Sequence, residues 1–428
     1  MGLISEDAAH PLCRRPTPLR PGSPVPLASS TAAAGASRAT GSPRDQRWPW
    51  WPLLPLYPYG RRRTLIRELI PGQVWSFEQL QGVFYVAVPI RMTVVRLRHG
   101  LMLYAPVAPT AEVLVALRDL EQRHGPVRSI VLPTSSGLEH KLPVPAMARA
   151  FPSAEVWVTP RQWSFPLPLP LAWLGFPAGR TRVLFDQGLP HADQLHWHAL
   201  GPLDLGLGSF MEAACLHRLS GSLLVCDGLV AIGNLPPEIF DSDPRPLLFH
   251  ARDRGDEPVE DSAERRLRGW RRLVLFASYL RPERLQVPGW GEVFTQAMGP
   301  GLRRADAYFG LYPFRWSEGW EMEFRALVPE GRPVMQVAPV VERLVLPRRR
   351  DALLAWLQAL AMEAEVRWLV PAHYDAPVPC TAEDLAGLVE SIKARAWAPD
   401  DGSWSYLAGI DTTLLKLGVV PGEPSQAH

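Results

Sequence analysis

The chain has 428 residues, enough for one large domain or two ordinary ones. Its 45 basic and 43 acidic side chains leave a formal net charge of +2, so composition does not support nucleic acid or another strongly charged partner. The four cysteines lie far apart without a CxxC pair, which argues against a zinc ribbon or a disulfide framework and favours a reducing compartment. No run of about 18 apolar residues is present, so we expect no membrane-spanning helix.

The amino-terminal stretch, residues 1–47, is predicted to be disordered. It is rich in Ala, Ser, Pro and Arg and has no hydrophobic periodicity, so ordering it would bury too little apolar surface to offset the entropy cost. Arginines outnumber acidic residues there, as in a plastid transit peptide. An unstructured extension of a bacterial protein accounts for the same composition equally well.

An aromatic strip follows at residues 48–60, WPWWPLLPLYPYG, with proline at every third position as in a polyproline II helix. Arg61, Arg62 and Arg63 come next, so residues 48–63 are suited to peripheral contact with an anionic membrane or a protein partner. We favour the alternative that the strip packs along its own domain, because large exposed apolar patches are rare. Residues 48–81 are assigned as a lead-in.

From Gly82 onward the pattern is typical of strands, in GVFYVAVP, TVVRLRH and LMLYAPV. A helix is predicted next, beginning at the capping residue Thr110 and ending at Gly125. A strand in SIVLP, a helix over residues 144–150 and a strand in AEVWVTP follow, and the Pro-alternating FPLPLPLAW is expected to be an extended loop. Four more strands are predicted in TRVLF, QLHWHAL, FMEAACLH and SLLVCD.

The remaining chain is predicted to be mainly helical. Residues 228–348 are assigned approximately as an insertion that decorates the core, with helices near residues 264–279 and 292–298. A helix, strand, helix unit then closes the main domain, residues 82–397, and a tail covers residues 398–428. This unit consists of residues 351–363, the strand VRWLVPAH, and residues 381–396, which open with Thr381 and Asp384 at capping-box spacing.

Three potential metal ligands each follow an apolar strand: His140 after SIVLP, Asp227 after SLLVC and His373 after RWLVP. Strand ends are where α/β proteins gather functional groups. Two imidazoles and a carboxylate suit zinc or iron, and Glu139 offers a fourth donor. Any one of these histidines alone is more often a hydrogen-bonded structural residue, but their shared placement favours a common site.

The order of these residues resembles that of metallo-β-lactamase-like proteins. Their first motif, H-x-H-x-D-H, follows a strand, and a later histidine, a strand-ending aspartate and a final histidine complete the set. The matching positions here are Ser135, Gly137, Glu139, His140, Asp227 and His373. WSFEQLQG, RMTVVRL, LPTSSGLEHK and WVTPRQWSFP are also similar to an uncharacterised branch of that superfamily from cyanobacteria and plant plastids. The resemblance implies a metallo-β-lactamase-like αββα sandwich in a cyanobacterial cytoplasm or plastid stroma.

The departures from the motif concern the metal ligands. Ser135 and Gly137 stand where the family has two histidines, and glycine has no donor, so the resemblance implies that the first metal site is lost. The residues that match the second site imply at most one zinc or iron ion, held by Glu139, His140, Asp227 and His373. Glu212 and His217 lie near the missing middle histidine, but an unbroken strand points only one of them inward, and a solvent-facing or hydrogen-bonded role is the commoner one for each.

Other motifs carry less chemistry. The sequence has no P-loop, no G-x-G-x-x-G after a strand and no G-x-S-x-G elbow, which argues against common nucleotide-binding and serine-hydrolase classes. His191, His196 and His198 cluster in PHADQLHWH. Because no acidic residue stands nearby at ligand spacing, we interpret the H-x-H pair as strand surface residues.

Two hypotheses about function follow. In the first, the chain is a weak metal-dependent hydrolase that activates water against an unknown small ester, thioester or phosphoester. In the second, it is a non-catalytic scaffold of the photosynthetic cell that docks on a protein or membrane surface through residues 48–63. Metal content distinguishes the two hypotheses.

Overall fold

The computed structural model describes residues 56–58, 61–83, 85–163, 168–205, 208–329 and 332–422. The segment predicted to be disordered, most of the aromatic strip and part of the Pro-alternating loop therefore lie outside the described residues. No helix within these ranges is long and apolar enough to cross a bilayer.

The first sheet has eight strands in the order β1-β3-β4-β5-β6-β7-β8, with β2 also paired to β3. Pairing is antiparallel from β1 to β5 and parallel from β5 to β8. The strands are β1 (Leu56–Tyr57), β2 (Leu65–Ile70), β3 (Val74–Val83), β4 (Val86–Leu97), β5 (Gly100–Tyr104), β6 (Val127–Leu132), β7 (Glu155–Val158) and β8 (Thr181–Val183).

This sheet begins earlier in the chain than the sequence pattern predicted. Strands β2 and most of β3 lie before Gly82, in the stretch interpreted as a lead-in. The reason is that Glu78 and Gln79 in β3 are fully buried polar side chains, so the apolar pattern of a buried strand is interrupted there. In the core, Oε1 of Glu78 pairs with Arg91 of β4 at 3.1 Å and also with Arg67 of β2.

Two predicted helices cover the outer face of the first sheet: α1 (Ala111–His124) and α2 (Val144–Ala150). The start of α1 is capped as predicted, since the Thr110 side chain accepts a hydrogen bond from the backbone N–H of Val113, and Gly125 ends the helix. Buried apolar residues on α1 and α2, such as Leu117 and Met147, pack against the strands in one core cluster. Both helices are therefore confirmed.

The second sheet has five strands in the order β17-β16-β11-β10-β9. All pairs are antiparallel except β11 with β16, which are parallel. Helices α9 (Arg350–Ala361) and α10 (Ala382–Ala394) cover its outer face, and Thr381 and Asp384 form the predicted capping box. The strands are β9 (Leu195–Asp204), β10 (Ser209–His217), β11 (Ser222–Val225), β16 (Trp368–Pro371) and β17 (Val378–Pro379).

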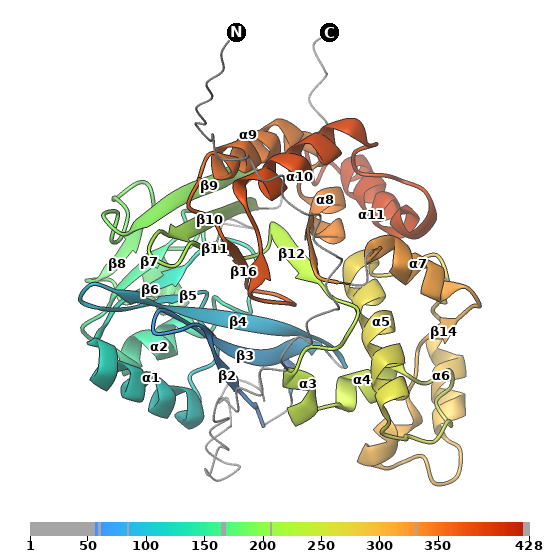
Figure 1. Ribbon diagram of the computed structural model, residues 1–428. Helices are drawn as coiled ribbons and strands as arrows, with labels where there is room; N and C mark the ends of the chain where they lie inside the picture. The colour runs from blue at the N-terminus through green and yellow to red at the C-terminus, as the bar shows by residue number, and fades with distance from the viewer. Residues whose placement is uncertain are drawn as a thin grey trace, which may run out of the picture. The chain divides into compact units, whose positions relative to one another are not determined.

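The two sheets pack face to face, and their inner faces share one buried cluster that includes Tyr104, Val131, Cys215, Leu224 and Val370. In Figure 1 the layers therefore run from α1 and α2 through the two sheets to α9 and α10. This order is the expected αββα sandwich, which is confirmed.

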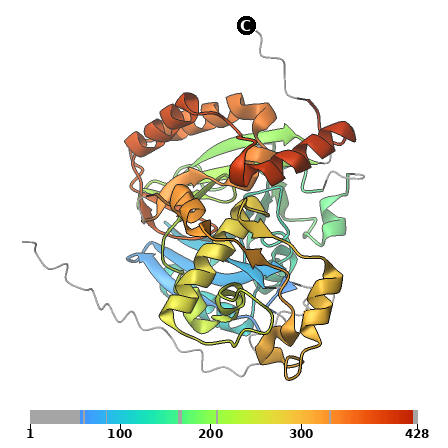
Figure 2. The same ribbon diagram turned by 90° about the vertical axis from the view of Figure 1, so that its right-hand side faces the viewer.

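The segment between β11 and α9 forms the predicted helical insertion, which lies beside the sandwich in Figure 1 and faces the viewer in Figure 2. A third buried cluster joins it to the edge of the first sheet, through residues such as Leu80, Trp270 and Tyr374. Its elements are β12 (Leu229–Ile232), α3 (Ile239–Ser242), α4 (Arg245–His250), α5 (Ala263–Tyr279), β13 (Leu285–Gln286), α6 (Trp290–Ala297), β14 (Arg315–Trp316), α7 (Trp320–Leu327), β15 (Val334–Val337) and α8 (Pro339–Leu344).

The stretch predicted as a carboxyl-terminal tail contains a further helix, α11 (Ser405–Lys416). Its Asp411 is buried and pairs with Arg343 at 2.6 Å and with Arg348 at 3.0 Å. Because a buried carboxylate needs such partners, these ion pairs attach α11 to the main body.

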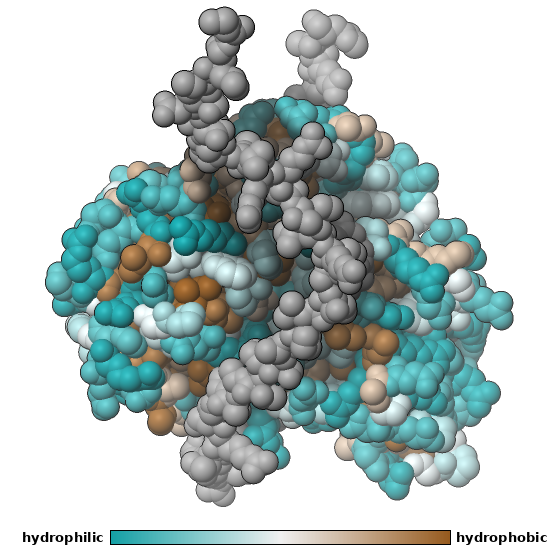
Figure 3. Space-filling view, viewed as in Figure 1, coloured by the Kyte–Doolittle hydropathy of each residue, from teal (hydrophilic) through white to brown (hydrophobic). Residues whose placement is uncertain are grey.

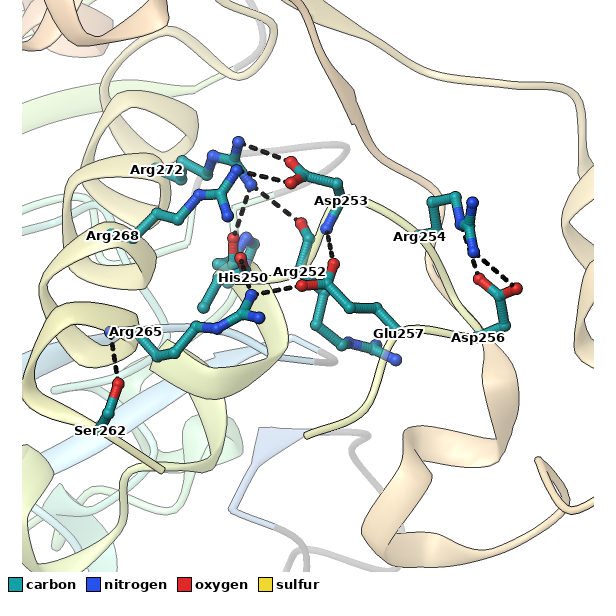
Figure 4. Close-up of polar contacts among 11 residues, drawn as sticks. His250, Arg252, Asp253, Arg254, Asp256, Glu257, Ser262, Arg265, Arg268 and Arg272 are labelled. Carbon is teal, nitrogen blue, oxygen red and sulfur yellow. Dashed lines mark hydrogen bonds and ion pairs between the residues drawn. The ribbon is translucent and has the colours of Figure 1, made fainter. Parts of the chain in front are cut away.

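Within the insertion, arginines of α5 hold the loop between α4 and α5 (Figure 4). Asp253 pairs with Arg272 at 2.8 Å and with Arg268 at 2.6 Å, and Glu257 pairs with Arg265. The Arg272 side chain is 1% exposed and also lies over the Trp320 ring at 4.8 Å. The insertion is therefore held by buried cation contacts as well as by apolar packing.

Candidate metal site

Two strand ends of the second sheet place Asp227 and His373 side by side. Strands β11 and β16 are parallel, and Val225 stands opposite Pro371 at their carboxyl ends. Asp227 and His373 each lie two residues beyond the end of their strand, so the shared register places both side chains at the same edge of the second sheet.

The loop after β6 brings the first motif to this edge from the other sheet. The N–H of Ser135 donates to the Met211 carbonyl at 3.0 Å, and the N–H of Ala213 donates to the Pro133 carbonyl at 2.7 Å. These two hydrogen bonds attach the loop to β10, next to β11. The loop after β6 therefore lies beside the ends of β11 and β16.

Glu139, Asp227 and His373 each offer one ligand atom, and these atoms lie within 4.8 Å of one another. No other group of three such residues meets this condition in the described part of the chain. The His373 Nε2 is 3.3 Å from Oδ1 of Asp227. We call these three residues the acidic-histidine triad.

His140, the remaining predicted ligand, is outside this group, and its ring centroid lies 5.8 Å from that of His373. The two imidazoles share one arrangement: Nδ1 of His140 is 3.1 Å from the Pro106 carbonyl, and Nδ1 of His373 is 3.3 Å from the Pro89 carbonyl. Because a carbonyl only accepts, each Nδ1 carries the proton. The Nε2 of His140 is buried without a hydrogen-bond partner, so it holds a free lone pair.

Asp227 is oriented by hydroxyl groups of the loop after β6. Its Oδ2 accepts hydrogen bonds from Thr134 Oγ1 at 2.7 Å and from Ser136 Oγ at 2.8 Å, whereas its Oδ1 faces His373. Sequence analysis missed both hydroxyl residues. Three consecutive hydroxyl residues, 134–136, begin two residues after β6, but hydroxyl residues are too common in loops for this run to identify the contact.

The contact between Asp227 and His373 favours the charged form of both side chains, a carboxylate and an imidazolium. Burial disfavours the ionised form of Asp227, but the bonds from His373, Thr134 and Ser136 outweigh it and lower the pKa of that carboxyl. Burial likewise opposes the imidazolium of His373, but Asp227 raises the pKa of that ring. For His140, burial dominates and lowers the pKa, which keeps its Nε2 lone pair available.

Ser135 and Gly137, at the two positions where the sequence resemblance led us to expect histidines, supply no free donor. The Ser135 hydroxyl donates to the Ser209 carbonyl at 2.8 Å. Gly137 has no side chain and a φ of +64°, a backbone conformation that favours glycine. A buried lysine supports this turn, because Lys141 Nζ donates to the carbonyls of Ser135 at 2.9 Å and Gln162 at 2.6 Å, and burial lowers its pKa to about 8.

Glu212 and His217 do not belong to the triad. The Glu212 carboxylate is fully buried and accepts backbone N–H bonds from Cys226 at 2.7 Å, Asp227 at 3.0 Å and Gly228 at 2.5 Å. Burial and then the Asp227 charge raise the pKa of Glu212 to about 7, although the three N–H donors oppose the shift. His217 pairs with Ser222 at the start of β11, the end of the strand opposite to Asp227, and bonds to Ser220 at 2.8 Å.

The H-x-H pair has an acidic partner that the sequence interpretation did not foresee. Glu363 Oε1 lies 2.8 Å from Nε2 of His198 and 3.3 Å from Nδ1 of His196. Glu363 is 165 residues from His198 in the chain, so spacing could not reveal it. His191 lies apart from this pair, with Nε2 3.0 Å from the Ser129 hydroxyl.

The chain belongs to the family described as a domain of unknown function, DUF4336, whose model matches residues 71–390. No curated protein matches the sequence. Among solved structures, the chain is similar to DIM-1 metallo-β-lactamase at 8% identity, covering 77% of this chain and 98% of that chain, with a TM-score of 0.36. A metallo-β-lactamase from Pontibacter korlensis is 11% identical, with 78% and 100% covered and a TM-score of 0.33. A flavo di-iron protein variant from Thermotoga maritima is 9% identical, with 77% and 62% covered and a TM-score of 0.38.

Proposed function

We propose that the chain binds one zinc or iron ion through Glu139, His140, Asp227 and His373 and is a weak metal-dependent hydrolase. The observation that carries this proposal is the arrangement of the two imidazoles. Each donates its Nδ1 proton to a backbone carbonyl, which is how metal-ligating histidines are usually oriented. The buried Nε2 of His140 has no other partner, and a metal ion would supply one.

The donor set also fits the chemistry of such an ion. Two imidazole nitrogens and two carboxylates suit zinc or non-haem iron. In the chain alone, the proton shared between His373 and Asp227 offsets the charge of the partly buried Asp227 carboxylate, so metal binding would release this proton. A bound ion supplies a water molecule whose pKa is lowered toward neutrality.

A single ion is favoured over two. Two hydroxyl groups already bond to Oδ2 of Asp227, which leaves Oδ1 as the oxygen directed at His373. With Ser135 bonded to a carbonyl and Gly137 without a side chain, the first-motif positions add no ligand. A clamp of two ions on attacking and leaving oxygens is therefore not expected, and hydrolysis would be slower than in binuclear enzymes.

The scaffold hypothesis receives less support from the described residues. Tyr57 and Arg62 of the 48–63 segment are both 1% exposed, and the Tyr57 hydroxyl donates to Asp243 at 2.6 Å. Hydrophobic side chains on the face drawn in Figure 3, outside its grey atoms, form several separate patches among hydrophilic ones. Docking through residues 48–63, and a location in a cyanobacterial cytoplasm or plastid stroma, stay predictions from the sequence.

Metal analysis of the purified chain tests the proposal. We expect about one zinc or iron ion per chain, and its loss in a variant with His140→Ala and His373→Ala. The matched control replaces His196 and His198 with alanine, which removes two histidines that share a carboxylate elsewhere. Folded, metal-free wild-type protein after growth and purification with added zinc or iron would overturn the proposal.

A further inference from the structure

An apolar cavity of about 300 Å³ lies beside the acidic-histidine triad. Glu139, Asp227 and His373 form part of its wall. The rest of the wall is mostly apolar and comes from β4, β12, α5 and the start of α8, with side chains such as Val88, Val230, Ile232, Ala277 and Val340. The cavity therefore has the candidate metal ligands on one part of its wall and an apolar surface, suited to a hydrocarbon group, on the rest.

The charge of this wall restricts what it can hold. None of the described residues that line it is a lysine or an arginine. The nearby Lys141 directs its Nζ to the carbonyls of Ser135 and Gln162 instead. A phosphate or carboxylate inside would lie near Glu139 and Asp227, and the one side chain of the wall that could pair with it, His373, is already paired with Asp227 at 3.3 Å, so burying an anion there is unfavourable in the metal-free chain. An uncharged ligand is favoured.

We infer that this cavity binds the acyl chain of an uncharged carboxylic ester and holds the ester group at the triad. A dry cavity of about 150 Å³ accommodates benzene, so 300 Å³ has room for roughly two such groups, or an acyl chain of roughly eight carbons. The inference rests on the proposed function for its chemical step. In that step the oxygen of water bonds to the acyl carbon, the acyl carbon to alkoxy oxygen bond breaks, and a proton from water passes to the departing alcohol.

Binding is tested first on the full chain stripped of metal. The neutral fluorophore N-phenyl-1-naphthylamine should bind saturably, and methyl octanoate should displace it at concentrations at least about tenfold lower than octyl phosphate. Equal or better displacement by octyl phosphate would overturn the inference, as would the absence of saturable binding.

Two cavity variants and one control variant test whether the ester binds in this cavity. Each methylene excluded from an apolar site weakens binding about fourfold, so Val340→Phe should weaken methyl octanoate binding about tenfold. Val340→Ala enlarges the cavity and should shift the preference toward decanoate esters. The control Val115→Phe lies on α1, where the side chain is 71% exposed, and should change nothing. Equal weakening by Val115→Phe and Val340→Phe would contradict the assignment.

The failure of this inference can be distinguished from failure of the proposed function. Metal-loaded protein should hydrolyse p-nitrophenyl octanoate with a kcat/KM about tenfold above the acetate ester. Metal binding with hydrolysis but without chain-length preference or methyl ester binding would overturn the cavity assignment alone. Ester binding to a chain that takes up no metal would overturn the hydrolase proposal and support the cavity.

Discussion

A Cβ atom at residue 137 would lie 2.3 Å from Oε1 of Glu139, so Gly137 and the triad carboxylate occupy adjoining space. Contacts under about 3 Å to a Cβ require a neighbour to move. Residue 137 also has a φ of +64°, which other residues adopt only with strain. A side chain at residue 137 would therefore require the Glu139 carboxylate to move.

The first prediction follows from this steric conflict. Gly137→Ala should displace the Glu139 carboxylate and lower zinc affinity about 10- to 100-fold, the range seen when groups that orient ligands are altered. Competition with a fluorescent chelator measures the affinity. Gly72→Ala is the matched control, because Gly72 has a similar φ of +68° and nothing lies within 4 Å of its added Cβ. Unchanged affinity in Gly137→Ala would contradict this prediction.

The second prediction concerns Glu212, whose carboxylate holds the backbone on both sides of Asp227. Glu212→Gln replaces one acceptor oxygen with an amide that donates, leaving buried N–H groups of residues 226–228 short of a partner. We expect the free energy of unfolding to fall by about 3 kcal/mol. Urea denaturation at about pH 8.5, where Glu212 is ionised, measures it.

Glu363→Gln provides the comparison for Glu212→Gln. Glu363 contacts His196 and His198 in a partly exposed place, with 18% of its side chain accessible. Its loss should cost under about 1 kcal/mol, because partly solvated pairs contribute little. Equal effects of the two substitutions would show that Glu212 does not hold the Asp227 loop.

Much of the sandwich was predictable because its layers are amphipathic in a regular way. The Thr110 cap and the apolar spacing of α1 indicate a helix that buries one face. The apolar run of β11 indicates a strand that is buried on both faces. Strand β3 was missed because Glu78 and Gln79 are buried through pairing with residues elsewhere, such as Arg91. Burial of a paired charge leaves no trace in local hydrophobicity.

The same distinction applies to the candidate site: residues marked by a local pattern could be predicted, whereas contacts between distant residues could not. Asp227 and His373 could be predicted because each directly follows a strand, and parallel strands end at one edge. The support of Asp227 by Ser136 could not, because 91 residues separate them and hydroxyl groups are common in loops. Glu363 was missed for the same reason. Sequence patterns identify residues at strand ends, whereas partners across layers require the fold.

The third prediction is an acid-dependent loss of stability through His250. This ring is fully buried beside Phe249 and Phe314, and burial lowers its pKa from 6.5 to about 3. Between about pH 6.5 and pH 3, His250 is protonated in the unfolded chain but not in the folded chain, so the free energy of unfolding falls as the pH falls. The contribution is up to about 1.4 kcal/mol per pH unit.

His250→Phe should remove this contribution. Chemical denaturation between about pH 6 and pH 4.5 should show a shallower loss of stability in the variant than in wild type, by up to about 1.4 kcal/mol per pH unit. Other buried histidines such as His217 act in the same direction in both proteins. Phe314→Leu removes packing without a titrating group and should lower stability equally at both ends of the range. Parallel curves for His250→Phe and wild type would refute the assignment.

The fourth prediction concerns the buried pair of Glu78 and Arg91, which lies behind His373. Arg91 donates to the carbonyls of Pro371 and Tyr374, on either side of Ala372 and His373, while Glu78 neutralises its charge at 3.1 Å. Glu78→Gln would leave the Arg91 guanidinium underpaired in the core. We expect the free energy of unfolding to fall by about 3 kcal/mol, the lower end for a broken buried pair.

A double variant separates the stability of this pair from its positioning role. Glu78→Gln with Arg91→Met removes both charges, so denaturation should show part of the lost stability regained. Zinc affinity should not recover, because the carbonyls beside His373 have lost their shared donor and the ring is no longer held against Asp227. If affinity recovered together with stability in the double variant, Arg91 would have no part in placing His373 beyond keeping the core folded.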